Sequence, residues 1–554
     1  MGDWIAKGVV AAALLVVIGL PVALRVAIAG GEGEVVDAGA DRLVVMTPHN
    51  EQIRFEFARG FNAYRAEHGL GAVTFDWRVD GTSNLRRQVL SQYQSVVARG
   101  GGMDDGIGVD MFFGGGPYDH NKLASGIKVG EASEPVSRPA RIDEAVFASA
   151  YPSAEIGGEP LYREDRLWLG TALSSFGIVY NRDVMATLGV PEPEGWDDLA
   201  DPRLAGWVAL ADPAHSGSIA ATYNVILQRF GWERGWSVLR ECFANARYFA
   251  AGSNKVPIDV SAGSAATGMC IDFFGRYQAG AIGGDRVGYT DPSKATADGG
   301  RVSMTVVTAD PVTLLRGAPN RELAESFIEW VITAEAQRLW QRRLDTEGGP
   351  AQFELRRQPV RVDLFTAEEK AAWADPEIDT FNRASAMPEG TPNYFGTVAL
   401  LTHSIAIDIH DELKAAWLEL RDGDWSEAEY AEAYALFHAM PAELSIDWPA
   451  GAEGRAMAIV ADPSDPLHHA VVEALDGFVS GLGSRWRDDR AYLADRLAFT
   501  LFFRDNYRAV ASGDIDRVMR RIDEVRGSAG RLGGMPEVEA LPVAAAGGAG
   551  PGLD

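Results

Sequence analysis

The sequence of 554 residues predicts an α/β protein followed by a mainly helical region. Short apolar runs alternate with amphipathic helical patterns between residues 43 and about 360. Beyond residue 365 such runs become rare, and capped helical patterns follow one another. Hydrophobic residues make up 47% of the chain and charged residues 23%, which excludes a mainly disordered protein because cores can form.

The first elements predict a mainly parallel sheet. A strand at 43–46 precedes a helix that places Ile53, Phe57 and Phe61 on one face. A strand at 73–75, a helix beginning at 82–84 and a strand at 109–113 follow, and the last strand ends in glycines 114–116. A β-α-β-α-β series of this kind implies parallel strands covered by helices.

The later elements continue this pattern and then change. Strands are predicted at 167–172, 176–180, 207–211, 267–273 and 303–309, and helices at 193–200, 217–230, 232–244 and 320–341. Thr366 and Ser426 each begin an S/T-x-x-E capping box, which is typical of a helix start. Further helices are predicted at 388–420, 466–480, 487–511 and 514–526, and the Gly- and Ala-rich tail at 531–554 is expected to be disordered.

The N-terminus predicts export from the cytoplasm. Lys7 precedes an uncharged run at 8–24, and Ala27-Ile28-Ala29 forms an A-x-A cleavage pattern. The run is long for a signal peptide and short for a membrane-spanning helix. Residues 1–29 are therefore either a signal peptide or an N-terminal membrane anchor, with a possible inner-membrane tether through 8–29. Residues 30–42 read as a linker.

Composition excludes several classes of function. The formal net charge of −27 repels phosphate backbones, so no nucleic-acid partner is expected. The chain has two cysteines and no CxxC pair, which excludes cysteine-based zinc and iron–sulfur sites. Cys242 and Cys270 either form a disulfide or remain buried thiols. No G-x-S-x-G, P-loop, H-E-x-x-H or dinucleotide motif is present, so we expect neither an enzyme nor a cofactor.

Loops between strands and helices carry small polar residues that suit a binding site. In such a loop, free N–H groups and hydroxyls lie at the positive end of a helix dipole, where an anion binds well. In an open α/β sheet these loops gather beside the carboxyl ends of the strands. Each loop could instead serve only as a helix cap. The candidate ligand-binding residues are His49, Asn50, Thr82, Ser83, Gly115, Ser216, Gly217, Ser218, Ser253, Asn254 and Lys255.

Five segments together carry a resemblance to a known family. They are LVVMTPHNEQIRFEF at 43–57, VDMFFGGGPYDHNKLASG at 109–126, DPRLAGWVALADPAHSGS at 201–218, AGSNKVPIDVSAGSAATGMCIDFFGRYQAG at 251–280 and LLRGAPNRELAESFIEWVITAEAQRLW at 314–340. In this order they resemble bacterial extracellular solute-binding proteins of the ferric-iron type, the periplasmic receptors of ABC importers.

The resemblance implies a type 2 periplasmic-binding-protein-like fold, in which two α/β lobes capture a small solute by hinge closure. It places lobe 1 at 43–165 with 310–360 returning to it, and lobe 2 at 166–309. It also implies a periplasmic location and an ABC transporter permease as partner. The helical C-terminal module at 365–530 is not covered by the resemblance.

The resemblance also bears on iron. Ferric receptors of this type use adjacent tyrosines and, in some members, a histidine of the first loop, which here is His49. The tyrosine pair corresponds to Phe273-Phe274. Fe³⁺ needs anionic oxygen donors, which phenylalanine lacks. We therefore expect an organic or oxyanionic solute, with Arg276 and Lys255 as countercharges and Phe273, Phe274 or Tyr118 stacking on it. Packing in the core is the alternative role for the two phenylalanines.

A second reading belongs to another class of function. The binding fold could serve in a membrane-tethered sensor or interaction protein, with the helical module docking a partner. An enzyme is a third reading, because a fold does not fix a function.

Overall fold

The computed structural model describes residues 41–295 and 300–533. The predicted signal peptide or anchor at 1–29, residues 30–40 of the linker and residues 534–554 of the tail lie outside the described residues. Asp41 already belongs to the first strand, and Arg531 pairs with Met440, so the described fold extends beyond both predicted limits. Within the described ranges, no helix combines the length and apolar character needed to cross a membrane.

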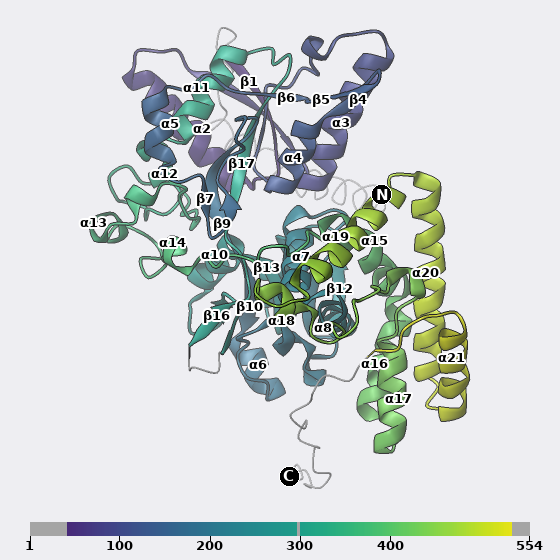
Figure 1. The fold of residues 1–554 in the computed structure, drawn as a ribbon. Helices are drawn as coiled ribbons and strands as arrows, with labels where there is room; N and C mark the ends of the chain where they lie inside the picture. The colour runs from purple at the N-terminus through teal and green to yellow at the C-terminus, as the bar shows by residue number, and fades with distance from the viewer. Residues whose placement is uncertain (1–40, 296–299, 534–554) are drawn as a thin grey trace, which may run out of the picture.

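The first lobe contains a six-stranded mixed sheet with helices on both faces (Figure 1). The strand order is β2-β1-β3-β17-β6, and β9 pairs with β17. Strands β1, β2 and β3 are parallel, as predicted. The strands are β1 (Asp41–Thr47), β2 (Val73–Val79), β3 (Met111–Phe113), β6 (Ser137–Arg138), β9 (Leu169–Ser174) and β17 (Thr308–Leu315). The helices are α2 (Glu51–Glu67), α3 (Thr82–Ala98), α4 (Pro117–Ser125), α5 (Glu144–Ala150), α11 (Arg321–Val331) and α12 (Ala334–Arg338).

Burial on both faces explains why the central strands β1 and β3 are mainly apolar. Val45 packs into the core formed with α2 and α11, which includes Phe57 and Phe327. Its neighbour Val44 packs into a second core on the opposite face, formed with α3 and α4. Successive side chains of a strand point to opposite faces, so a strand between two helical layers has no polar face.

The second lobe contains a five-stranded sheet in the order β12-β11-β13-β10-β14. The strands are β10 (Phe176–Asn181), β11 (Val208–Ala211), β12 (Ala246–Ala250), β13 (Thr267–Ile271) and β14 (Val287–Thr290). The helices are α6 (Arg182–Leu188), α7 (Gly217–Phe230), α8 (Trp232–Ala244), α9 (Lys255–Ser261) and α10 (Asp272–Ile282). Three two-stranded hairpins complete the strands: β4 (Ile127–Val129) with β5 (Ala132–Glu134), β7 (Glu155–Ile156) with β8 (Glu159–Pro160), and β15 (Ser293–Ala295) with β16 (Arg301–Ser303).

The chain crosses between the lobes at two neighbouring places. It leaves the first sheet after β9 and enters the second at β10, with Ser175 alone between them. It returns between β16 and β17, where the Thr305 hydroxyl accepts a hydrogen bond from the Phe176 N–H at 3.2 Å. The first crossing therefore comes later than the predicted boundary between 165 and 166, since β9 still pairs with β17.

The region beyond residue 365 is helical, as predicted. Ser426 and Glu429 form the predicted capping box. The predicted helix at 388–420 is divided in two, because the chain turns between Ala406 and Ile409. The helices are α13 (Ala367–Lys370), α14 (Thr380–Arg383), α15 (Phe395–Ile405), α16 (His410–Asp422), α17 (Glu427–Phe437), α18 (Ala456–Ala461), α19 (His468–Arg485), α20 (Asp489–Val510) and α21 (Ile515–Gly527). The predicted fold class, two α/β lobes with a helical C-terminal module, is confirmed.

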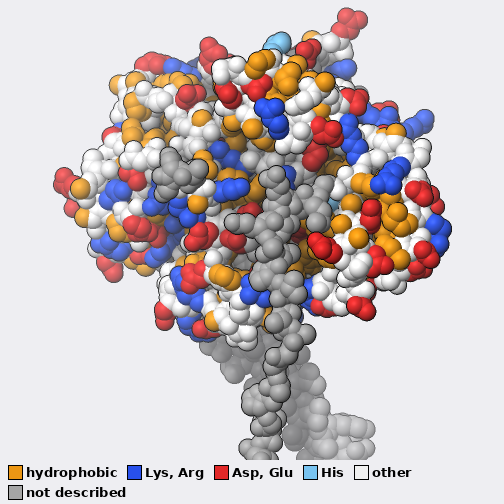
Figure 2. Space-filling view, turned by 60° about the horizontal axis from the view of Figure 1, so that its bottom comes forward, with side chains coloured by type: hydrophobic (Ala, Val, Ile, Leu, Met, Phe, Trp, Pro, Cys, Tyr) orange, Lys and Arg blue, Asp and Glu red, His pale blue; other side chains and the backbone are white. Residues whose placement is uncertain are grey.

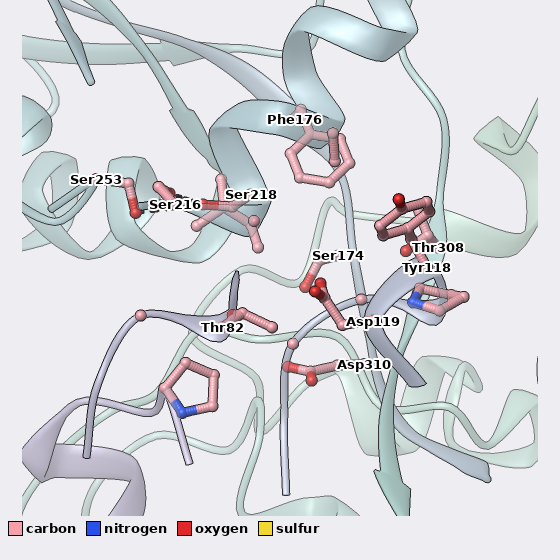
Figure 3. A pocket seen from close by; sticks show the side chains of 18 of the residues that line it. Thr82, Tyr118, Asp119, Ser174, Phe176, Ser216, Ser218, Ser253, Thr308 and Asp310 are labelled. Atoms are coloured by element: carbon pink, nitrogen blue, oxygen red, sulfur yellow. Dashed lines mark hydrogen bonds between the residues drawn. The ribbon is translucent and has the colours of Figure 1, made fainter. Parts of the chain in front are cut away.

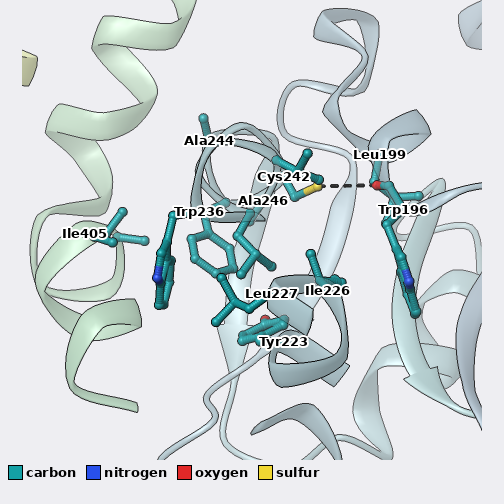
Figure 4. Packing of buried hydrophobic residues seen from close by; sticks show 14 of the residues in the cluster. Trp196, Leu199, Tyr223, Ile226, Leu227, Trp236, Cys242, Ala244, Ala246 and Ile405 are labelled. Carbon is teal, nitrogen blue, oxygen red and sulfur yellow. Dashed lines mark hydrogen bonds between the residues drawn. The ribbon is translucent and has the colours of Figure 1, made fainter. Parts of the chain in front are cut away.

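The helical module shares one hydrophobic core with lobe 2. Ile405 of α15 lies beside Trp236 of α8 (Figure 4). The Trp417 indole donates to the Asn245 side chain at 2.7 Å, and the Trp232 indole donates to the Leu444 carbonyl at 2.8 Å. From α15 onward the helical module therefore forms a single packed body with lobe 2, whereas α13 contacts α12 of lobe 1 through the Arg338–Glu369 ion pair.

The structure also answers the question of the two cysteines and shows how charge is distributed on one face. Cys242 and Cys270 are buried free thiols, so no disulfide joins them. On the face shown in Figure 2, outside what the grey atoms cover, Lys and Arg side chains are interspersed with Asp and Glu.

Candidate ligand-binding site

A cleft of about 1070 Å³ lies between the two lobes. Lobe 1 lines it with the loops that follow β1, β2 and β3, and lobe 2 with the loops that follow β11 and β12. These loops end at the starts of helices, so the cleft collects helix N-termini from both lobes (Figure 3). The location matches the rule that ligands of open α/β sheets bind beside the carboxyl ends of strands.

The three glycines after β3 allow lobe 1 to pack closely around the cleft. Gly114 and Gly115 have φ angles of +99° and +103°, which side chains rarely adopt. A Cβ at Gly114 would lie 2.6 Å from Nε2 of His49. At Gly115 it would lie 2.4 Å from Cγ2 of Thr82. Glycine is therefore needed to bring the start of α4 against the loops that carry His49 and Thr82.

The starts of α3 and α7 leave backbone N–H groups available to a ligand, and α4, which begins with Pro117, offers the N–H of Tyr118. The first N–H groups of a helix have no partner within the helix. Gly81 and Gly116, which precede α3 and α4, have no side chain to cap them. The Ser216 hydroxyl caps α7 by accepting a hydrogen bond from the Ile219 N–H. It also lies 3.1 Å from the Ser218 hydroxyl, which donates to the Ser253 hydroxyl at 3.2 Å. The site thus offers N–H and O–H donors from both lobes.

The two lobes touch at one edge of the cleft. A Cβ at Gly81 of lobe 1 would lie 2.3 Å from the carbonyl oxygen of His215 in lobe 2. A Cβ at Gly217 would lie 3.2 Å from Cβ of Thr82. The N-termini of α3 and α7 consequently face each other across a narrow gap, and the structure represents a closed arrangement of the lobes.

The floor of the cleft holds a buried polar group of four side chains. Asp310 of β17 forms an ion pair with Arg357, whose guanidinium also donates to the Ser174 hydroxyl at 2.8 and 3.2 Å. Nε2 of His49 lies 3.3 Å from Oδ2 of Asp310 and 3.2 Å from Nη1 of Arg357. Asp310, Arg357 and His49 are 3%, 2% and 4% exposed, so the group is held away from solvent.

Burial and charge set the ionisation of this group. Burial lowers the pKa of His49, although Asp310 opposes the shift. Burial would raise the pKa of Asp310, but Arg357 and His49 outweigh it and the net pKa lies below its usual value. At neutral pH the floor therefore contains a neutral imidazole and a compensated ion pair. Such a pair contributes little net charge toward a ligand.

Two cations of lobe 1 line the cleft without an acidic partner in the described part of the chain. Arg54 of α2 donates only to the Asn50 carbonyl, at 3.3 Å. The ammonium of Lys122 lies 5.2 Å from the centre of the Tyr118 ring. Burial lowers the pKa of Lys122, and Arg86 adds to the shift. Arg54 and Lys122 are thus available to an anionic solute.

The structure brings eleven of the fourteen predicted site residues to the cleft. They are His49, Asn50, Thr82, Gly115, Ser216, Gly217, Ser218, Ser253, Asn254, Phe273 and Phe274. Asn50 also caps α2 through the N–H of Ile53. Asn50 therefore both caps a helix and lines the cleft, so the two roles do not exclude each other.

Ser83, Lys255 and Arg276 do not line the cleft. Ser83 is buried at the second position of α3, with 4% of its surface exposed. Lys255 pairs with Asp259 one turn later on α9 and is largely in solvent. Arg276 pairs with Asp291 at 2.7 Å and stacks on the Tyr289 ring. Both cations that were predicted as countercharges for the ligand therefore form ion pairs with neighbouring carboxylates.

Phe273 and Phe274, which correspond to the tyrosine pair of the ferric receptors, both line the cleft and also pack against neighbouring side chains. Phe273 is 6% exposed, and the Arg357 guanidinium lies 4.5 Å above its ring. Phe274 packs on Phe273 with ring centres 4.4 Å apart. Neither ring offers an oxygen donor, and Tyr277 does not line the cleft. Among the residues that the structure describes, no three His, Cys, Asp or Glu side chains are placed to share a metal ion.

Sequence reasoning missed residues that reach the cleft from distant parts of the chain. Ser174 ends β9, Asp310 lies within β17, and Arg357 follows the helices that complete lobe 1. Asn393 and Phe395 come from the helical module. One local signal was available, because Asp310 is an acid within an otherwise apolar strand and such an acid needs a buried partner.

Comparison with known proteins shows that part of this chain is similar to a family of binding proteins. Residues 142–362 match the family model described as bacterial extracellular solute-binding protein. This match confirms the predicted resemblance. The matched segment includes the loops of lobe 2 that line the cleft and the return of the chain to lobe 1.

Individual relatives are distant. The phosphoglycerate transport regulatory protein PgtC of Salmonella typhimurium is 23% identical over 171 residues, which cover 31% of this chain and 40% of that protein. Among solved structures, the periplasmic binding protein AfuA of Actinobacillus pleuropneumoniae with fructose-6-phosphate bound is 14% identical. The similarity covers 68% of this chain and 98% of that chain, with a TM-score of 0.47. The apo ferric ion-binding protein A of Pasteurella haemolytica is also 14% identical, with 67% and 99% covered and a TM-score of 0.48.

Proposed function

We propose that this protein is an exported, non-enzymatic receptor that captures a small anionic solute between its lobes and delivers it to an ABC transporter permease. The observation that carries the proposal is the meeting in one cleft of three helix N-termini and two cations, Arg54 and Lys122, that have no acidic partner among the described residues. The family match supports the receptor role, and the cleft supports the charge of the solute.

The anion is held by local groups against an acidic protein. The chain carries a formal net charge of −27, which disfavours an anion at long range. Within the cleft, however, the starts of α3, α4 and α7 line one space, where a carboxylate or phosphate would be stabilised by the positive ends of the helices. Arg54 and Lys122 add positive charge from lobe 1. The ligand-binding role of the eleven predicted residues at the cleft is part of this proposal.

The names of two relatives suggest which anions to test. PgtC is named for phosphoglycerate transport, and AfuA was solved with fructose-6-phosphate. Both compounds join an anionic phosphate to a small organic body. We therefore define a phosphate panel of 3-phosphoglycerate, fructose 6-phosphate and inorganic phosphate, with ferric citrate as a comparison.

Thermal unfolding and calorimetric titration of the purified protein test the proposal. A member of the panel that binds the native state should raise the melting temperature, because a ligand at 100 times its Kd stabilises by about 2.7 kcal/mol. Arg54→Gln and Lys122→Gln should each weaken that binding roughly tenfold or more, since hydrogen bonds to charged groups contribute about 1.5–3 kcal/mol. Lys128→Gln, at an exposed position of β4, is the matched control. Absence of any thermal shift across the panel would sink the proposal.

A further inference from the structure

The helical C-terminal module reaches the binding cleft through a short segment at its start. Asn393 and Phe395 line the cleft, although they lie far along the chain from the loops of the two lobes. Phe395 begins α15, the helix that packs between α7 and α20. The cleft therefore has a third wall in addition to lobe 1 and lobe 2.

This wall is fixed to lobe 2 by polar contacts with α7. The Asn224 side chain accepts a hydrogen bond from the Tyr394 N–H at 2.8 Å, and Gln228 donates to the Pro392 carbonyl at 3.1 Å. The Tyr394 ring is fully buried and lies 5.4 Å from Trp232. Helix α7 thus begins at the cleft with Gly217 and, further along, holds the segment that carries Phe395.

An aromatic pair connects this wall to lobe 1 across the cleft. The rings of Tyr118 and Phe395 are stacked, with centres 4.0 Å apart and planes inclined by 24°. Tyr118 belongs to α4 and follows the glycines that shape the lobe 1 side of the cleft. Because Tyr118 moves with lobe 1 and Phe395 with lobe 2, separation of the lobes must break this stack.

We propose that the module completes the ligand site, with Asn393 and Phe395 contacting the organic body of the solute and the Tyr118–Phe395 stack holding lobe 1 closed over it. This inference rests on the proposed function and narrows the solute to an organic anion. The helix starts can hold the anionic group, whereas the amide of Asn393 and the ring of Phe395 suit a polar organic body. A cleft of about 1070 Å³ also exceeds what an inorganic ion needs.

Two alanine variants and one control test the contact with the solute. Phe395→Ala and Asn393→Ala should weaken binding of 3-phosphoglycerate or fructose 6-phosphate, whichever binds, by roughly 2- to 10-fold. Binding of inorganic phosphate should be unchanged. Phe502→Ala, on α20 and packed on Arg521 of the module, should bind as wild type. Circular dichroism and melting temperature verify that each variant is folded.

A double-mutant cycle and X-ray scattering test the closing contact. Tyr118→Ala and Phe395→Ala should be less than additive in the affinity cycle, because either change removes the same stack. In scattering without solute, Tyr118→Ala should show a larger radius of gyration than wild type and Phe502→Ala. Wild-type organic-anion affinity in both Phe395→Ala and Asn393→Ala overturns the inference.

Failure of the proposed function gives a different pattern. In that case the wild-type protein binds no member of the phosphate panel, and scattering alone decides the role of the stack. An expanded Tyr118→Ala variant then supports the closing contact. An unchanged radius of gyration overturns it.

Discussion

Replacement of Gly81 by alanine should obstruct closure of the lobes while leaving each lobe intact. Gly81 has φ −63° and ψ 144°, a backbone conformation that alanine adopts without strain. Its Cβ would lie 2.3 Å from the His215 carbonyl oxygen of the opposite lobe. Carbon and carbonyl oxygen normally approach to about 3.3 Å, so the lobes must move apart by about 1 Å at this edge.

The expected magnitude follows from the cost of inserting a methyl group into a packed contact. That cost is about 1–3 kcal/mol. Since 1.4 kcal/mol is a factor of ten in affinity, Gly81→Ala should weaken solute binding roughly 5- to 150-fold. The clash exists only where the lobes meet, so the fold within each lobe should be unchanged, which circular dichroism checks.

Titration calorimetry with the panel member that binds, together with X-ray scattering, measures this effect. The radius of gyration of Gly81→Ala in the presence of that compound should remain above the wild-type value. Gly71→Ala serves as the matched control, because a Cβ at this lobe 1 glycine meets nothing within 4 Å. Wild-type affinity and a wild-type radius of gyration in Gly81→Ala would refute the closed contact between α3 and the His215 loop.

Three further predictions concern pH and the shared core. Burial raises the pKa of Asp272 to about 7, so stability from its protonated form is complete below about pH 4 and is lost as pH rises through 7. Asp272→Asn should therefore raise the free energy of unfolding, measured in urea at pH 8, by up to a few kcal/mol, since each pKa unit corresponds to about 1.4 kcal/mol. An equal gain at pH 4 would contradict an effect that comes from ionisation of Asp272. Burial lowers the pKa of His403, but the hydrogen bond to Asp212 helps to reverse this and the net pKa is raised. The stabilisation from protonated His403 is complete below about pH 6.5 and is lost as the pH rises through the raised pKa. His403→Gln should therefore flatten the dependence of the unfolding free energy on pH in this range. An unchanged slope would be inconsistent with the His403–Asp212 pair. A chain ending at residue 364 should lack a cooperative melting transition for lobe 2, because the module completes the lobe 2 core. A sharp calorimetric transition from that truncated chain would show that lobe 2 folds alone.

The parts of the site that sequence reasoning found are encoded locally. A strand, a short polar loop and an amphipathic helix follow one another within about ten residues, as at Asn50, Thr82 and Ser216. Helix capping and the parallel arrangement of strands then bring such loops to one edge. The same local rules located most helices of the module, because capping boxes and apolar stripes need no distant partner, but they did not find the short helices α14 and α18.

The parts that were missed depend on contacts between distant segments. Nothing near Arg357 in the chain indicates that it meets Asp310 and Ser174, since the lobe is completed only when the chain returns. Arg276 was assigned to the ligand because its partner, Asp291, follows an intervening strand. The sequence does contain the partner of Lys255, because Asp259 lies four residues later on the same helix and oppositely charged side chains at this spacing attract each other.

The order in which the chain is made gives the shared core a further consequence. Lobe 1 lacks β17 until residue 315 has been synthesised, and lobe 2 lacks part of its core until α21 is complete at residue 527. Neither lobe can reach its native packing while only the first half of the chain has emerged. Apolar surface of lobe 2 thus stays uncovered throughout most of synthesis, and during passage across a membrane if the chain is exported unfolded. A protein built in this way needs protection from aggregation until its last helices arrive.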